Sequence, residues 1–345
     1  MKKTIYIVGM VAVLGMATSL PVQAGNKDRV GTAGATEIMI PVSARNLALS
    51  NSFTANLSGI DGVTLNPASV GLMPKNEVYF SNMKYLADIN VYYFGAGINA
   101  GDVGNFGFTI KSLDFGEITK TTTTNPYGTG ETFSPTFVTL GLTYAKELTE
   151  YIQFGTTVKV IHESISNASA TGVGVDVGFQ YSGSGVIPGL NFGIVVKDIG
   201  LTKMVFEGQG LTNADSRANG APPSAGKKKY VTPSEPFDIP SSFEFGVSYK
   251  LDMSDLMSLN MGSNYVNRNI SYDLYNFGGE LSYNNLVYIR GGYSYAVDAT
   301  DTPFGATFGV GLNYNLGFDI TFDYGYRAVE YFGDANQLVS VKIGI

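Results

Sequence analysis

The sequence predicts an all-β protein: a transmembrane antiparallel up-and-down β-barrel of about 14 strands with an N-terminal plug segment. The first observation is that segments of about ten residues recur along the chain, each with an apolar side chain at every second position. The second is the composition, with 43 Gly, 22 Tyr and 21 Phe in 345 residues and only 15% charged residues. The third is that no later segment is a continuous apolar run of the length that a membrane-spanning helix needs. A chain of this kind crosses a membrane only as a closed barrel.

Residues 1–24 have the three parts of a secretion signal. Lys2-Lys3 form the basic start, Ile5–Leu14 the apolar run, and Val22–Ala24 the cleavage site. Cleavage before Gly25 removes two of the 22 basic residues and none of the 29 acidic ones, so the formal net charge falls from −7 to −9. An acidic chain lacks the basic surface that nucleic acids require, so we expect no nucleic-acid partner. Without Cys, the exported chain has no disulfide framework.

We expect residues 25–75 to form a periplasmic and plug segment, and residues 76–345 to form the barrel. Residues 25–43 begin with a polar stretch, and we place them on the periplasmic side. From Ala44 to Leu72 apolar residues first recur at roughly helical spacing, and turn-forming residues follow. This pattern predicts a compact plug of one short helix and a turn. The helical stripe is Leu47, Leu49, Phe53 and Leu57, and the turns lie at Gly59, Asp61-Gly62 and Asn66-Pro67.

The same segment contains a motif of three short elements. In order they are Ser52-Phe53-Thr54-Ala55, Asp61-Gly62 and Asn66-Pro67-Ala68. Directly before the strands, this order resembles the N-terminal signature of the PorV/PorQ family, relatives of the FadL-type outer-membrane transporters. Gly62 departs from the usual alanine, and Ser69-Val70 departs from the usual Gly-Leu. The resemblance implies that the segment tucks into the base of a barrel in the cell outer membrane.

The strands follow from the alternation, which is clearest over residues 304–314 and 318–326. In the Gly172–Gly178 run, valine alternates with Gly and Asp. We interpret it as a strand whose small inner face lets a bulky plug lie against the wall. Strands are expected near residues 76–85, 90–100, 104–113, 135–146, 151–163, 171–182, 189–198, 241–251, 255–266, 272–283, 286–297, 303–315, 316–328 and 336–345.

A soluble β-sandwich would also alternate, and the connections between strands decide against it. Even-numbered connections are tight turns, whereas most odd-numbered connections are longer and polar, as expected when one end of a barrel faces the periplasm and the other the outside. The seventh connection, 198–240, is the longest, and the third, 114–134, is a weaker candidate for an outer functional loop.

Catalysis is poorly supported. His162 is the only His, and no Ser lies in a Gly-x-Ser-x-Gly frame, so we expect no enzyme activity, cofactor or metal. Asp319 and Asp323 would lie about 13 Å apart on one strand face, too far for a catalytic carboxylate pair. We instead expect them to line a polar lumen, together with Lys111, Glu280, Arg290 and Arg327.

The resemblance implies a role as a docking barrel in protein secretion of the type IX kind. Its outer loops, chiefly 199–240, would bind secretion-system or cargo proteins. The candidate docking residues are Arg217, Lys227, Lys228 and Lys229.

The alternative is a FadL-like transporter of long-chain fatty acids or other hydrophobic molecules. This function requires an apolar pocket above the plug, which the stripe of Leu47, Leu49, Phe53 and Leu57 could help to line. In both cases outer-membrane lipid surrounds the barrel. A general porin ranks lowest, because a plugged barrel leaves little open channel.

Overall fold

The computed structural model describes residues 29–183, 187–208, 214–216, 228–230, 233–297, 299, 302–315, 317–331 and 334–345. The predicted signal peptide, residues 1–24, lies outside the described residues. No helix in the described part of the chain is long and apolar enough to cross a membrane.

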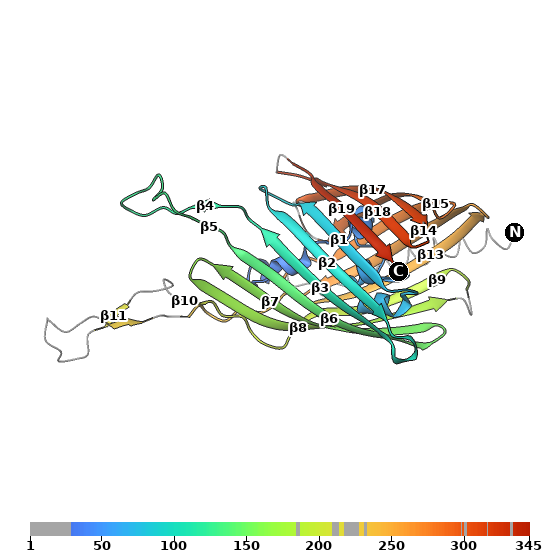
Figure 1. Cartoon of the computed structure of the whole chain (residues 1–345), viewed down its shortest axis with the longest axis horizontal. Coiled ribbons are helices and arrows are strands. Elements are labelled where there is room, and N and C mark those ends of the chain that lie inside the picture. The colour runs from blue at the N-terminus through green and yellow to red at the C-terminus, as the bar shows by residue number, and fades with distance from the viewer. Residues whose placement is uncertain are drawn as a thin grey trace.

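The main sheet closes into a barrel of 14 antiparallel strands, which confirms the predicted fold class (Figure 1). Neighbouring strands in the sequence are neighbours in the barrel, and β1 pairs with β19 along its whole length to close the wall. The strands are β1 (Glu77–Lys84), β2 (Asn90–Asn99), β3 (Asn105–Asp114), β6 (Thr136–Thr149), β7 (Ile152–Ile165), β8 (Ala168–Gly183), β9 (Leu190–Gly200), β13 (Ser242–Ser254), β14 (Met257–Arg268), β15 (Leu274–Tyr283), β16 (Val287–Ala296), β17 (Phe304–Asn315), β18 (Asp319–Val329) and β19 (Asn336–Gly344).

The two faces of the wall differ as the alternation predicts. On β17, Phe308, Val310 and Leu312 point outward and are 58%, 52% and 51% exposed, whereas Thr307 points inward and is 1% exposed. The outer surface is therefore the apolar band of a barrel in lipid, and the polar side chains line the lumen. Barrel closure removes the free strand edges, so every wall strand has a partner on both sides.

The longest connections lie at one end of the barrel, which we call the outer end (Figure 1). Residues 115–135 carry β4 (Ile118–Thr119) and β5 (Thr132–Phe133), which pair with each other. Residues 201–241 carry β10 (Glu207–Gly208), paired with β8, and the pair β11 (Ala214–Ser216) and β12 (Lys228–Tyr230). At the opposite end, residues 100–104 include the 3₁₀ turn η5 (Gly101–Val103). The fifth connection is shorter than expected, because β7 and β8 pair as far as Ile165 and Ala168 and leave a two-residue turn.

The plug lies inside the barrel and consists of short helices joined by turns (Figure 1). They are η2 (Thr36–Met39), α2 (Ala44–Ala48), η3 (Ile60–Gly62) and η4 (Pro67–Leu72). The predicted helical stripe is wrong as a single helix. Ser50 and Asn51 have positive φ angles of 51° and 55°, so the chain turns after α2. Leu49, Phe53 and Leu57 nevertheless meet, together with Leu65, in one buried cluster.

Residues 29–43 differ from their predicted periplasmic position, because they lie against the outer half of the barrel. Ala35 packs with Met204 and Ile239 of the seventh connection, and Arg29 forms an ion pair with Asp238 at 3.3 Å. These partners come from a loop that is far away in the sequence. The location therefore could not follow from the polarity of the segment itself.

A belt of inward-facing glycines leaves room for the plug, as expected for Gly178. A Cβ added at Gly262 would lie 2.9 Å from the Phe53 ring, and one added at Gly292 would lie 2.6 Å from the carbonyl carbon of Leu49. The plug backbone thus approaches the wall more closely than any larger residue would allow. Other glycines of the belt are Gly95, Gly97, Gly107, Gly155, Gly178, Gly193, Gly246, Gly278, Gly309 and Gly325.

Candidate functional site

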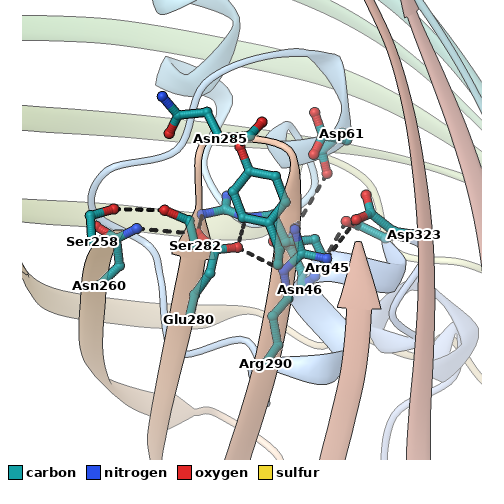
Figure 2. Close-up of polar contacts among 12 residues, drawn as sticks. Arg45, Asn46, Asp61, Ser258, Asn260, Glu280, Ser282, Asn285, Arg290 and Asp323 are labelled. Carbon is teal, nitrogen blue, oxygen red and sulfur yellow. Dashed lines mark hydrogen bonds and ion pairs between the residues drawn. The ribbon is translucent and has the colours of Figure 1, made fainter. Parts of the chain in front are cut away.

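The plug is joined to the wall by a buried network of charges, which we call the plug lock: Arg45, Glu280, Arg290 and Asp323 (Figure 2). Arg45 of α2 donates two hydrogen bonds to the Glu280 carboxylate, from Nε at 2.9 Å and from Nη2 at 3.0 Å. Arg290 of β16 donates to the same carboxylate at 2.7 Å and to Asp323 of β18 at 2.5 Å. Two arginines and two carboxylates therefore neutralise one another in a place that water hardly reaches.

Burial alone would lower the pKa of Arg45. The Glu280 carboxylate and its hydrogen bonds more than offset this effect, so the pKa of Arg45 is raised above its ordinary value. The side chain thus keeps its charge inside the barrel. The guanidinium fits the carboxylate in the two-point geometry that makes such pairs strong.

A second set of contacts fixes η3 to the strands at the barrel seam. Lys342 of β19 donates to Asp61 at 2.8 Å, and the backbone N–H of Ile60 donates to Glu77 of β1 at 2.9 Å. Asp61 belongs to the predicted motif, and its carboxylate is buried. The Asp-Gly element therefore supplies a plug-to-wall ion pair as well as a turn.

The Asn-Pro-Ala element fixes the other half of the plug. The Asn66 side chain accepts from the N–H of Ala68 at 3.1 Å and so caps η4, while Pro67 occupies its first turn. The side-chain amide nitrogen of Asn66 donates to the carbonyls of Thr54 at 2.9 Å and Phe179 at 3.1 Å. The one side chain thus links the two ends of the motif and joins both to β8.

A cavity of about 90 Å³ lies between the plug and the outer half of the wall. Its plug side includes the apolar residues Ile38–Val42, Val63 and Leu65. Its wall side is polar, because the inward positions of eight neighbouring strands, from β2 to β14, carry ionisable or hydroxyl groups. The charged side chains that line it are Lys111, Lys159, Asp176, Lys197, Asp198, Glu244 and Arg268.

A bulge in β9 places two of these charges side by side. The register with β8 shifts between Val175 and Val177, so that Lys197 and Asp198 oppose the single residue Asp176. Asp198 has a φ of 58°, and its N–H donates to Asp176 at 2.7 Å. Both Lys197 and Asp198 line the cavity as a result, whereas in a regular strand only one of two consecutive residues would do so.

A second pocket, of about 610 Å³, lies next to the outer ends of β9, β13 and β14. Its apolar lining includes Ile199, Leu201 and Phe243, all of them exposed. Pairing between β9 and β13 begins at Lys197 and Ser242, so the last residues of β9 have no partner on β13. Ser242 lines both this pocket and the lumen cavity.

The ligand-facing, docking and motif residues that were predicted from the sequence lie in different parts of the structure. Leu47, Leu49, Phe53 and Leu57 are 0–1% exposed, and none of them lines the lumen cavity. Their ligand-facing role stays a prediction and requires the plug to move. Arg217 and Lys227 lie outside the described residues, and Lys228 and Lys229 belong to β12. The motif residues Ser52, Phe53, Thr54, Ala55, Asp61, Gly62, Asn66, Pro67 and Ala68 are buried in the plug.

Most of the charged cavity was not predicted. Of the expected lumen residues, Lys111 lines the cavity, Glu280, Arg290 and Asp323 form the plug lock, and Asp319 pairs with Lys75 near the opposite end at 2.9 Å. The signal for Lys159, Asp176 and Glu244 was present, because each occupies an inward position of its strand. Among the described residues, no three His, Cys, Asp or Glu side chains form a group that could hold a metal ion.

The fold and lumen define a class: an outer-membrane β-barrel that its own N-terminal segment closes. In agreement, the structure is similar to the Pseudomonas putida toluene transporter TodX over 87% of this chain and 96% of that one, with 13% identity and a TM-score of 0.54. It is similar to the CymD monoaromatic hydrocarbon channel over 88% and 96%, with 14% identity and a TM-score of 0.52. A Pseudomonas aeruginosa FadL homologue covers 88% and 97%, with 12% identity and a TM-score of 0.48.

At these identities the likeness establishes the fold alone, which is that of the TodX and CymD barrels. No family model and no curated protein matches the sequence. The narrower resemblance to the PorV/PorQ family therefore stays a prediction from the motif.

Proposed function

We propose that the chain is a non-enzymatic outer-membrane channel that takes up small hydrophobic molecules from outside the cell. The observation that carries this proposal is the pair of pockets on the two sides of the wall at β9 and β13. An arriving molecule would bind first in the larger outer pocket, against Ile199, Leu201 and Phe243. It would then pass the bulged stretch of β9 into the lumen cavity.

The volumes support a closed resting state. The outer pocket, at about 610 Å³, is within the range of small-molecule sites. The lumen cavity, at about 90 Å³, is smaller than the cavity of about 150 Å³ that admits benzene in an engineered protein core. Passage therefore requires the plug to shift. TodX is a toluene transporter and CymD is a monoaromatic hydrocarbon channel, and both are consistent with this proposal.

A docking role in protein secretion is the second proposal, and it rests on the motif resemblance. Its candidate surface is the connection 199–240, of which Arg217 and Lys227 lie outside the described residues. We rank it below the channel, because the two pockets are suited to a small molecule. The docking role rests on the motif resemblance alone.

The test locks the plug to the wall. The chain has no Cys, so a pair of introduced cysteines can form only the intended disulfide. Ser50 of the plug and Thr307 of β17 have hydroxyl oxygens 2.8 Å apart, which makes Ser50→Cys with Thr307→Cys a suitable pair. The readout is uptake of radiolabelled toluene by cells that express the chain.

We expect the wild type to accelerate uptake, the oxidised pair to abolish the acceleration, and a reductant to restore it. The matched control is Ser258→Cys with Ser282→Cys, whose hydroxyls are 2.8 Å apart on the neighbouring wall strands β14 and β15, outside both pockets. This disulfide should leave uptake unchanged. Uptake equal to that of cells without the protein, before any cross-linking, would overturn the proposed function.

A further inference from the structure

The lumen cavity has two chemically different sides. The plug contributes a largely apolar side, through Ile38–Val42, Val63 and Leu65, and the wall contributes charges. A hydrocarbon would contact only the first side, whereas a molecule that also carries a polar group would contact both. The cavity therefore suits a molecule with one apolar face and at least one polar group.

Most charges on the wall side already have partners. Lys159 lies between Asp176, at 2.9 Å, and Asp198, and forms an ion pair with each. Lys197 pairs with Glu244 at 2.5 Å. The three carboxylates that line the cavity are thus all engaged by these two lysines, and none is left over for the remaining cations.

The remaining cations are Lys111 and Arg268. Lys111 donates to three plug carbonyls, those of Glu37 at 2.6 Å, Ile40 at 2.7 Å and Ile38 at 3.3 Å, and so is used in holding the plug. Arg268, at the outer end of β14, is within the electrostatic reach of Glu244, which Lys197 already engages, and it forms no hydrogen bond or ion pair of its own among the described residues. Its guanidinium is the group of the cavity that can receive a ligand.

We propose that the preferred molecules are small amphipathic acids, with a single ring or a short chain, and that Arg268 binds their carboxylate. This inference rests on the proposed channel function and narrows its substrate class. The guanidinium fork matches a carboxylate in two-point geometry. The apolar part of the acid lies against Ile38–Val42. The acid must be small because the resting cavity has a volume of only about 90 Å³ and a shift of the plug enlarges it from that value.

The test compares benzoate with benzamide, a neutral molecule of the same shape. Cells without general porins express the wild type, Arg268→Gln, Arg268→Lys or the plug-locked cysteine pair, and uptake of each radiolabelled compound is measured above the locked background. We expect the wild type to favour benzoate by roughly tenfold, which corresponds to about 1.4 kcal/mol. Arg268→Gln should lose this preference without losing benzamide uptake, and Arg268→Lys should restore part of it.

The matched control is Lys75→Gln, which removes one positive charge at the opposite end of the barrel, away from the cavity lining. Lys75 pairs with Asp319 at 2.9 Å, and its replacement should leave the benzoate preference intact. Equal uptake of both compounds by the wild type, or an unchanged preference in Arg268→Gln, would overturn the inference and leave the channel function standing. Uptake of both compounds at the locked background would instead contradict the channel function itself.

Discussion

Arg45 in the plug and Glu280 in the wall form a two-point ion pair, with N–O distances of 2.9 and 3.0 Å, across 235 residues of sequence. Glu280 is also held by Arg290, so the carboxylate serves two guanidinium groups, one that belongs to the plug and one that belongs to the wall. Movement of α2 would break the two hydrogen bonds between Arg45 and Glu280 and leave the hydrogen bond between Arg290 and Glu280 in place. Glu280 therefore stays neutralised when the plug moves, and the main electrostatic cost falls on Arg45.

This asymmetry predicts different effects at the two ends of the pair. Glu280→Gln leaves Arg45 without the carboxylate that it bonds and leaves Arg290 with Asp323 alone, and removal of one partner of a buried pair costs about 3–5 kcal/mol. Arg45→Gln should cost less, because Glu280 keeps Arg290. Hydrogen exchange of the α2 amides should report faster plug opening in Glu280→Gln than in Arg45→Gln.

The control for this comparison is Lys120→Gln, which breaks the exposed pair Lys120–Glu131 of the β4–β5 hairpin, 2.7 Å long. Such surface pairs contribute about 0–1 kcal/mol, so plug exchange should not change. If Arg45→Gln opened the plug more than Glu280→Gln, the shared-carboxylate account would be wrong.

The glycine belt predicts a sharp difference between two adjacent residues. A Cβ at Gly292 would lie 2.6 Å from the Leu49 carbonyl carbon and 2.8 Å from the Ser50 nitrogen, both backbone atoms that cannot move alone. A Cβ at Gly291 meets nothing closer than 3.8 Å. Gly292→Ala should destabilise plug docking by about 1–3 kcal/mol, and Gly291→Ala should not. Protease cleavage within the plug is a suitable measurement, and equal cleavage of the two variants would contradict the close approach.

The Asn66 side chain has two roles, as the cap of η4 and as a donor to two carbonyls, and substitution can separate them. Asn66→Ala removes the cap of η4 and both donated bonds, whereas Asn66→Ser keeps a side-chain oxygen as a neutral acceptor for the Ala68 N–H and loses only the amide donors. We expect Asn66→Ala to be the more destabilising by about 1 kcal/mol, the usual contribution of a helix N-cap. Thermal denaturation of the two purified variants would show it. Identical melting temperatures would indicate that the cap contributes nothing.

Glu37 predicts that docking of the segment 29–43 depends on pH. Burial raises the pKa of Glu37 from 4.5 to about 7, and the nearby Glu163 carboxylate adds to the rise, although Lys111 opposes it. Because the folded pKa lies above the unfolded one, the protonated carboxyl stabilises docking fully below about pH 4.5. This stabilisation, of order 3 kcal/mol, is lost as the pH rises through about 7.

The measurement is hydrogen exchange of the Ile38 and Ile40 amides, corrected for intrinsic rates, between pH 5 and 8. The Ile38 N–H donates to the Ala35 carbonyl, and the Ile40 N–H to the Glu37 carbonyl, so both report local opening. Protection should fall as the pH rises in the wild type and fall less in Glu37→Gln, in which Glu163 and Lys111 still titrate beside the segment. Protection that rises with pH would show the opposite sign of coupling.

Much of the architecture could be predicted, because the period of two along each strand is a local property. The alternation over 304–314 placed Phe308 and Leu312 outward and Thr307 inward, as the structure has them. The turn chemistry of Asp61-Gly62 and Asn66-Pro67 likewise predicted breaks that the structure shows as η3 and η4. The predicted single helix failed because helical spacing cannot distinguish a helix face from a cluster that turns at Ser50 and Asn51 bring together.

The sequence by itself determined the strands, their inner and outer faces, and the room that small inner residues leave for a plug. All of these depend on the side chain's place in a repeating backbone and on its size. Only the tertiary structure decided that Arg45 meets Glu280, that residues 29–43 lie at the outer end, and that Glu244, the carboxylate near Arg268, pairs with Lys197. These relationships join residues that are far apart in the sequence. They exist only because closure of the barrel brings opposite walls and the plug within the few ångströms over which charges and hydrogen bonds act.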